Sequence, residues 1–248
     1  MKNFEIIKEA AIKFYKNPVL GFPSLLQIVA NYVPVLLFIL GIVAVSGISI
    51  ASLMVDPTAI TSKAFSDALL LIIIFGIIMM IALIAINAFF DGMIIGMINS
   101  TKIKIEFDPG RKFFSRLFGF DLIFGIYMLI AVAILVGLAV LSVKVSMPLL
   151  IIPLLLLVVF LFSLPLFALT SYYIVINNLH VKDALKKSFK IVRKNYLKIL
   201  GIFILLMLIG IVVYIILDFI PVIGGILANL LMMTYMKICM WMFALGKA

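Results

Sequence analysis

The sequence is poor in the residues that most catalytic and metal sites need. It has one cysteine (Cys239), one histidine (His180) and one tryptophan in 248 residues. A single cysteine excludes an internal disulfide and any Cys-x-x-Cys metal or redox motif. The sequence also lacks a glycine-rich phosphate loop and the HExxH and GxSxG patterns. We therefore expect no catalytic site, no metal and no cofactor.

Charged residues are also scarce, at 12% of the chain, while hydrophobic residues make up 67%. A soluble domain is about 45–50% apolar and about 25% charged, so a soluble fold this apolar would lack polar side chains for its surface. The N-terminus does not read as a secretory signal, because Glu5 and Glu9 lie among its lysines and the following apolar run is too long. We expect a single integral membrane domain over residues 1–248.

Six apolar runs are long enough to cross a bilayer. A helix needs about 20 apolar residues to span a hydrocarbon core of about 30 Å. The runs that meet this length are residues 20–48, 68–99, 119–143, 148–176, 199–217 and 222–245. The predicted fold class is therefore all-α, a six-helix transmembrane bundle. Pro153 and Pro165 predict a kink in the fourth run.

The twenty basic residues are distributed unevenly over the connections between these runs. Alternate connections hold only Lys63 and Lys144, and Lys237 lies inside the sixth run. The other basic residues lie on the side that both termini share. Because cytoplasmic loops carry an excess of lysine and arginine, we predict a multi-pass protein of the cell membrane with cytoplasmic N- and C-termini.

Basic segments with helical periodicity precede the first, third and fifth runs. Residues 183–197 place Leu185, Phe189, Val192 and Tyr196 on one face. The other face carries the basic residues Lys186, Lys187, Lys190, Arg193 and Lys194. Residues 3–16 place Phe4, Ile7, Ala11 and Phe14 on one face, and residues 108–118 form a shorter version. Such helices lie in the headgroup plane with their apolar face in lipid.

This arrangement predicts three units, each an interfacial amphipathic helix followed by a transmembrane hairpin. The units would be weak repeats over about 1–99, 102–176 and 180–246. Their lysines predict the anionic lipids of the inner leaflet as partners. Nucleic acid is not expected, because the basic residues form short blocks between apolar runs. A membrane or cytoplasmic protein partner and a homo-oligomer both stay open.

Two ionisable residues lie inside spans, where charge is costly and each such residue is a functional hypothesis. Asp91 in the second run and Lys237 in the sixth lie at similar distances from cytoplasmic lysines. They could form an intramembrane ion pair, reach the interface separately from protruding helix ends, or belong to a transport site. We expect Asp121, a few residues after Arg116, to be interfacial.

Polar and small residues follow helical spacing in other spans. Ser24, Gln27 and Asn31 share one face of the first run, and Asn229 lies in the sixth. These side chains either form hydrogen bonds between helices or line a polar path. The second run carries a ladder of small residues, Ala88, Gly92, Gly96 and Ser100. The ladder permits close helix packing, within the monomer or in a homodimer.

Residues 163–201 carry a resemblance to a known family. The matching positions are Asp183, Ala184, Leu185, Ser188, Val192 and Asn195. The pattern resembles a prokaryotic superfamily of uncharacterised polytopic proteins related to the membrane domain of some glycerophosphoryl diester phosphodiesterases. Residues 9–26 and the turn around Ile220 and Gly224 share this resemblance. It implies a six-helix membrane architecture and an association with lipid or membrane homeostasis, but not phosphodiesterase activity, which belongs to a separate soluble barrel.

Two functions follow from these observations. The first is a non-catalytic, lipid-associated scaffold or membrane-homeostasis component that engages the anionic inner leaflet through its basic helices. The alternative is a small transporter or channel. Its polar path would involve Gln27, Asn31, Asp91, Asn229 and Lys237.

Overall fold

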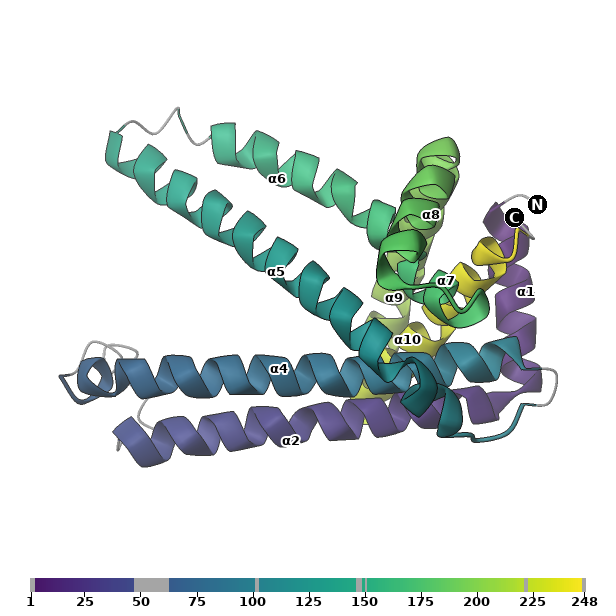
Figure 1. Cartoon of the computed structure of the whole chain (residues 1–248), viewed down its shortest axis with the longest axis horizontal. Coiled ribbons are helices and arrows are strands. Elements are labelled where there is room, and N and C mark those ends of the chain that lie inside the picture. The colour runs from purple at the N-terminus through teal and green to yellow at the C-terminus, as the bar shows by residue number, and fades with distance from the viewer. Residues whose placement is uncertain are drawn as a thin grey trace. The chain divides into compact units, whose positions relative to one another are not determined.

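The computed structural model describes residues 3–46, 63–100, 103–145, 149, 151–220 and 223–246. Within these ranges every regular element is a helix (Figure 1). The α-helices are α1 (Asn3–Lys16), α2 (Gly21–Ser46), α4 (Lys63–Asn99), α5 (Asp108–Val145), α6 (Ile151–Ser163), α7 (Thr170–Ile176), α8 (Val181–Lys194), α9 (Tyr196–Leu217) and α10 (Ile223–Ala244). Two 3₁₀ turns, η1 (Pro18–Leu20) and η4 (Leu164–Phe167), complete the set. The predicted all-α fold class is confirmed.

Six segments of the described chain are long and apolar enough to cross a membrane. They are Pro18–Ala44, Leu69–Asn99, Asp108–Ser142, Ile151–Ile176, Tyr196–Leu217 and Ile223–Ala244. These bounds follow the predicted apolar runs, so the six-helix prediction is confirmed and the chain fits a multi-pass membrane protein. Most of the predicted outer connections, and the basic residues Lys102 and Lys247, lie outside the described residues.

The chain divides into two compact units. One is Leu25–Asn87, and the other combines Met1–Ser24 with Ala88–Ala248. The first unit pairs α2 with the first part of α4 (Figure 1). Their spacing is set by phenylalanine rings packed on glycines. A Cβ built on Gly41 would lie 3.6 Å from the Phe75 ring, which is ordinary van der Waals contact.

In the larger unit, α10 is the most enclosed span, because half of its most apolar window is buried. Helices α1 and α9 pack against it. The Tyr235 hydroxyl of α10 donates a hydrogen bond of 2.7 Å to the Ile7 carbonyl of α1. The face of α1 that the protein buries lies part of a turn from the apolar face predicted from the sequence. Ile6, Ile7 and Ala10 are buried, whereas Phe4 is 72% exposed.

The basic segment 108–118 is not a separate interfacial helix. It forms the first three turns of α5, which continues without a break to Val145. Pro109 lies in the first turn, where a proline suits helix initiation, and no proline follows in α5. The second predicted unit therefore joins its basic segment directly to its span, and the threefold repeat itself stays a prediction.

The fourth span is interrupted near its C-terminal end, where its prolines predict a kink. Helix α6 ends at Ser163, and η4 holds Pro165 before α7 starts. A proline inside a helix removes one hydrogen-bond donor and frees a carbonyl. The buried Ser188 of α8 donates a hydrogen bond of 2.7 Å to the Leu166 carbonyl, so α8 satisfies part of this break.

Candidate functional site

Asp91 of α4 and Lys237 of α10 meet in an ion pair. The Lys237 Nζ lies 2.6 Å from the Asp91 Oδ1, and the two side chains are 8% and 25% exposed. At about 1.5 Å per residue, Lys237 lies roughly 10 Å before the end of its helix and Asp91 roughly 12 Å before the end of its own. The structure therefore brings the two residues together, each within a candidate span.

The pair borders a cavity of about 340 Å³. Asp121 of α5 lines the same cavity, together with Ser171 and Tyr172 of α7. Asp121, which was expected at the interface, is partly buried and lies within the candidate span Asp108–Ser142. In the part of the chain that the structure describes, its carboxylate makes neither a hydrogen bond nor an ion pair. The cavity thus holds two carboxylates and one ammonium.

Aromatic rings form much of the cavity wall. Phe120, Phe124, Phe167 and Phe203 all line it. The rings of Phe120 and Phe124 stack with centroids 6.1 Å apart, and the centroids of Phe124 and Phe167 lie 5.3 Å apart. Phe167 also meets Phe189 of α8 edge to face, with centroids 5.1 Å apart. These ring contacts connect the cavity wall to the middle of α8, through Phe189.

The small-residue ladder on α4 packs against the start of α5. A Cβ on Gly96 would lie 2.4 Å from the Pro109 Cβ, a distance that real Cβ contacts do not reach. A Cβ on Gly92 would lie 3.2 Å from the Pro109 carbonyl oxygen. Ala88 is fully buried, and Ser100 at the other end of the ladder is exposed. Gly92 and Gly96 therefore serve packing within one chain.

Two side-chain amides of α2 form hydrogen bonds with Asn87, a residue not predicted from the sequence. Gln27 Nε2 and Asn31 Nδ2 both donate to Oδ1 of Asn87 on α4, at 2.8 and 3.0 Å. Asn31 Oδ1 is buried without a partner among the described residues. Asn87 interrupts an otherwise apolar stretch of the second run. A single polar residue in such a stretch is a sequence signal from which Asn87 could have been identified.

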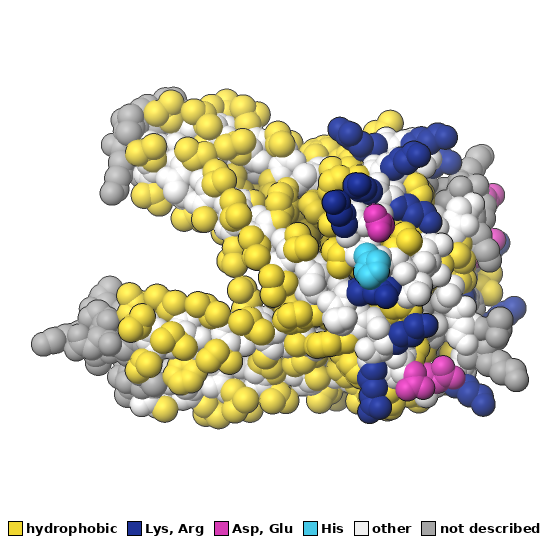
Figure 2. All heavy atoms as spheres, viewed as in Figure 1, with side chains coloured by type: hydrophobic (Ala, Val, Ile, Leu, Met, Phe, Trp, Pro, Cys, Tyr) yellow, Lys and Arg dark blue, Asp and Glu magenta, His cyan; other side chains and the backbone are white. Residues whose placement is uncertain are grey.

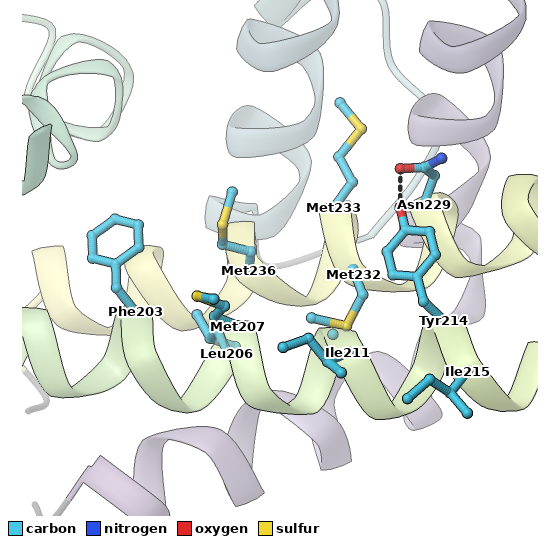
Figure 3. Close-up of a pocket in the computed structure, with 11 residues that line it drawn as sticks. Phe203, Leu206, Met207, Ile211, Tyr214, Ile215, Asn229, Met232, Met233 and Met236 are labelled. Carbon is cyan, nitrogen blue, oxygen red and sulfur yellow. Dashed lines mark hydrogen bonds between the residues drawn. The ribbon is translucent and has the colours of Figure 1, made fainter. Parts of the chain in front are cut away.

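The remaining polar residues of the predicted path have their own partners. Ser24 Oγ accepts a hydrogen bond of 2.7 Å from Thr234 of α10, and both side chains are fully buried. Asn229 Oδ1 accepts a hydrogen bond from the Tyr214 hydroxyl. Asn229 lies about 12 Å from Lys237 along α10 and lines a groove between α9 and α10 rather than the charged cavity (Figure 3).

Helix α8 presents basic side chains on its outer face. Lys186, Lys190, Arg193 and Lys194 are exposed, and basic side chains gather over this helix in Figure 2 while the α5–α6 hairpin is apolar. The opposite face, Ala184, Ser188 and Val192, is buried. That face packs against η4 and α7. Within the predicted apolar face of α8, Val192 is buried, and Leu185 and Tyr196 are partly buried against the core. Other parts of the protein therefore cover much of the face that was expected in lipid.

Lys187 differs from its four basic neighbours. Its Nζ donates to the Asn177 Oδ1 at 3.0 Å and lies 4.6 Å from the centre of the Tyr173 ring. The Lys187 side chain therefore also connects α8 to the end of α7, and its predicted headgroup role stays a prediction. The outward basic face consists of the other four residues.

A second lysine, Lys13, also makes contacts within the protein. Lys13 of α1 donates from Nζ to the Ile98 carbonyl at 2.9 Å, and its Nζ lies 3.5 Å from the centre of the Trp241 ring. Trp241 donates to the Asn99 Oδ1 at 3.3 Å. A cation near the last carbonyls of a helix is favoured by the helix dipole. These contacts join α1, α10 and the end of α4, and they were not predicted from the sequence.

Comparison with known proteins adds a family. Among the described residues, no group of three or more His, Cys, Asp and Glu side chains could hold a metal ion. A family model described as a domain of unknown function (DUF7847) matches residues 111–238, which include Asp121 and Lys237 but not Asp91. No curated protein and no solved structure matches the chain. The resemblance to phosphodiesterase membrane domains stays a prediction. Because the family model matches just over half of the sequence, the chain belongs to the DUF7847 family.

Proposed function

We propose that the chain is a non-catalytic protein of the cell membrane that engages anionic lipid of the inner leaflet through the outer face of α8. Lysine and arginine are concentrated in α1, the start of α5 and α8. Positive charge favours the cytoplasmic side of a membrane, so this distribution supports cytoplasmic termini. It also brings these helices to the leaflet that carries anionic lipid.

The observation that carries the proposal is how α8 is attached. Its inner face is buried, Ser188 is bonded to Leu166, and Lys187 is bonded to Asn177. The helix is thus attached to the end of the fourth span, and its four outward cations are exposed. A basic side chain near an anionic surface contributes about 1 kcal/mol. Four of them on one fixed face favour anionic over zwitterionic lipid.

The transporter alternative has less support. Its five residues form separate contacts: Gln27 and Asn31 with Asn87, Asn229 with Tyr214, and Asp91 with Lys237. A polar path needs side chains that face a common water-filled space. Hydrogen bonds between helices account for these amides without such a space.

Lipid selectivity of the full chain tests the proposal. The protein is reconstituted in phosphatidylcholine vesicles, and electron spin resonance measures the restricted fraction of spin-labelled phosphatidylglycerol and phosphatidylcholine. We expect a preference for phosphatidylglycerol, reduced at least about threefold in the variant K186Q/K190Q/R193Q/K194Q. The charge-preserving variant K186R/K190R/K194R should keep it. Equal selectivity in the glutamine variant and the unmodified chain would contradict the proposal.

A further inference from the structure

The charged cavity adjoins a larger apolar groove. A groove of about 690 Å³ lies between α9 and α10, and Phe203 and Met236 line both spaces. Figure 3 shows these two side chains at one end of the groove and the bonded pair Tyr214–Asn229 at the other. The apolar groove and the cavity that holds Asp121 are therefore neighbours, with Phe203 and Met236 lining both.

The groove has the character of a hydrocarbon site open to the membrane. Met207 and Ile215 on its rim are 67% and 61% exposed, and both lie in the candidate span Tyr196–Leu217. Its walls include Met207, Met232, Met233 and Met236. Methionine side chains are flexible and polarisable, so they adapt to chains of different shape. An alkyl chain can enter the groove laterally from lipid.

The cavity has the complementary charge for a cationic group. Asp91 is paired with Lys237, whereas the Asp121 carboxylate has no hydrogen-bond or ion-pair partner in the described part of the chain. When all three groups are ionised, one negative charge is left. Aromatic rings such as Phe124 and Phe167 line the same space, and ring faces attract ammonium groups. A volume of about 340 Å³ is within the range of small-ligand sites.

We propose that the cavity binds the ammonium head group of an amphiphile whose alkyl chain lies in the α9–α10 groove. Asp121 forms the ion pair with the ammonium, the aromatic wall packs around it, and Met236 and Phe203 flank the first carbons of the chain. This site lies inside the larger unit and uses none of the exposed cations of α8. Its test is therefore independent of the lipid selectivity proposed above.

Binding of hexadecylamine to the purified full chain in maltoside detergent tests the site. Native mass spectrometry counts the bound probe, and hexadecanol serves as the uncharged probe of equal chain length. We expect one hexadecylamine to bind at least about tenfold more tightly than hexadecanol, which corresponds to about 1.4 kcal/mol. D121N should lose this preference. E106Q, which removes an exposed acid outside the cavity, should keep it.

Either of two results would overturn the site: equal binding of the two probes, or a D121N variant that binds hexadecylamine like the unmodified chain. A second variant covers the case in which D121N does not fold. M236W replaces the flexible Met236 side chain, which lines both groove and cavity, with a bulky indole ring. It should therefore weaken hexadecylamine binding while leaving Asp121 intact. Unchanged binding in M236W would also overturn the proposal.

Discussion

The Lys237 ammonium of α10 lies 2.6 Å from a carboxylate oxygen of Asp91 on α4, inside two candidate spans. Each charge lost water on burial, so the two groups depend on each other. Removing one partner leaves an uncompensated charge in a poorly solvated place. The pair therefore holds the end of α4 and the centre of α10 in one register.

The first prediction concerns this pair. K237M should lower the free energy of unfolding by about 2 kcal/mol, less than for a fully buried pair because Asp91 is partly exposed. The double variant D91N/K237M should recover most of the loss. Unfolding in mixed micelles measures both. The control K190M, at an exposed position of α8, should change little. A K237M effect as small as that of K190M would refute the coupling.

The second prediction concerns the contact between Gly96 and Pro109. G96A should lower the free energy of unfolding by about 1–3 kcal/mol, because its new Cβ would overlap the Pro109 ring. G137A is the matched control, since a Cβ there meets nothing within 4 Å. It should be neutral or slightly stabilising because alanine favours helix over glycine. Equal effects of the two variants would show that Gly96 is not closely packed.

A substitution at Gly92 tests whether the ladder of small residues on α4 forms a homodimer interface. Since Gly92 and Gly96 are covered by the start of α5, they are not available for a homodimer that uses this ladder. G92L should therefore reduce stability in thermal unfolding without converting a dimer into a monomer. Light scattering with detergent correction measures the mass. A clean loss of dimer with unchanged thermal stability would favour the homodimer interpretation of the ladder.

The third prediction concerns Asn87. N87L removes the acceptor of both Gln27 and Asn31, so two amides lose their bond between helices. Hydrogen bonds between membrane helices contribute about 0.6–2 kcal/mol. We expect N87L to cost about 1–2 kcal/mol in unfolding experiments and N31L to cost less, since the Gln27 bond survives there. If N31L costs more than N87L, Asn87 is not the shared acceptor.

The fourth prediction uses the single tryptophan as a reporter. Lys13 lies over the Trp241 ring and binds the Ile98 carbonyl, so K13M should both shift the Trp241 emission and lower stability by about 1–2 kcal/mol. K16M, at an exposed position of the same helix, should do neither. Identical emission spectra for K13M and the unmodified chain would contradict the contact.

The fold could be predicted from the sequence because each apolar run is long enough to span a membrane as a helix. Lipid leaves a backbone no partner except itself, so a run such as 199–217 must be helical. The phase of α1 could not be predicted in the same way. That helix is apolar on more than one side, and contacts with α9 and α10 select Ile6 and Ala10 rather than Phe4.

The site could be predicted only in part. Asp91 and Lys237 stand out because charge inside a span is costly. Asp121 does not, since its closeness to Arg116 in sequence suggested an interface, and its place in the cavity depends on how α5 packs. Lys187 shows the same limit. Periodicity assigns it to the basic face, whereas the ring and amide that bind it come from α7 and the turn after it.

The central claim is that the basic face of α8 lies at the cytoplasmic leaflet. Single cysteines test it in a background where the buried Cys239 is replaced by alanine. K190C on α8 and D218C after α9 are labelled with a membrane-impermeant maleimide in intact cells and in inverted vesicles. The account predicts labelling of K190C only in inverted vesicles and of D218C only in intact cells. The reverse pattern would place the basic helix on the outer face and contradict the account.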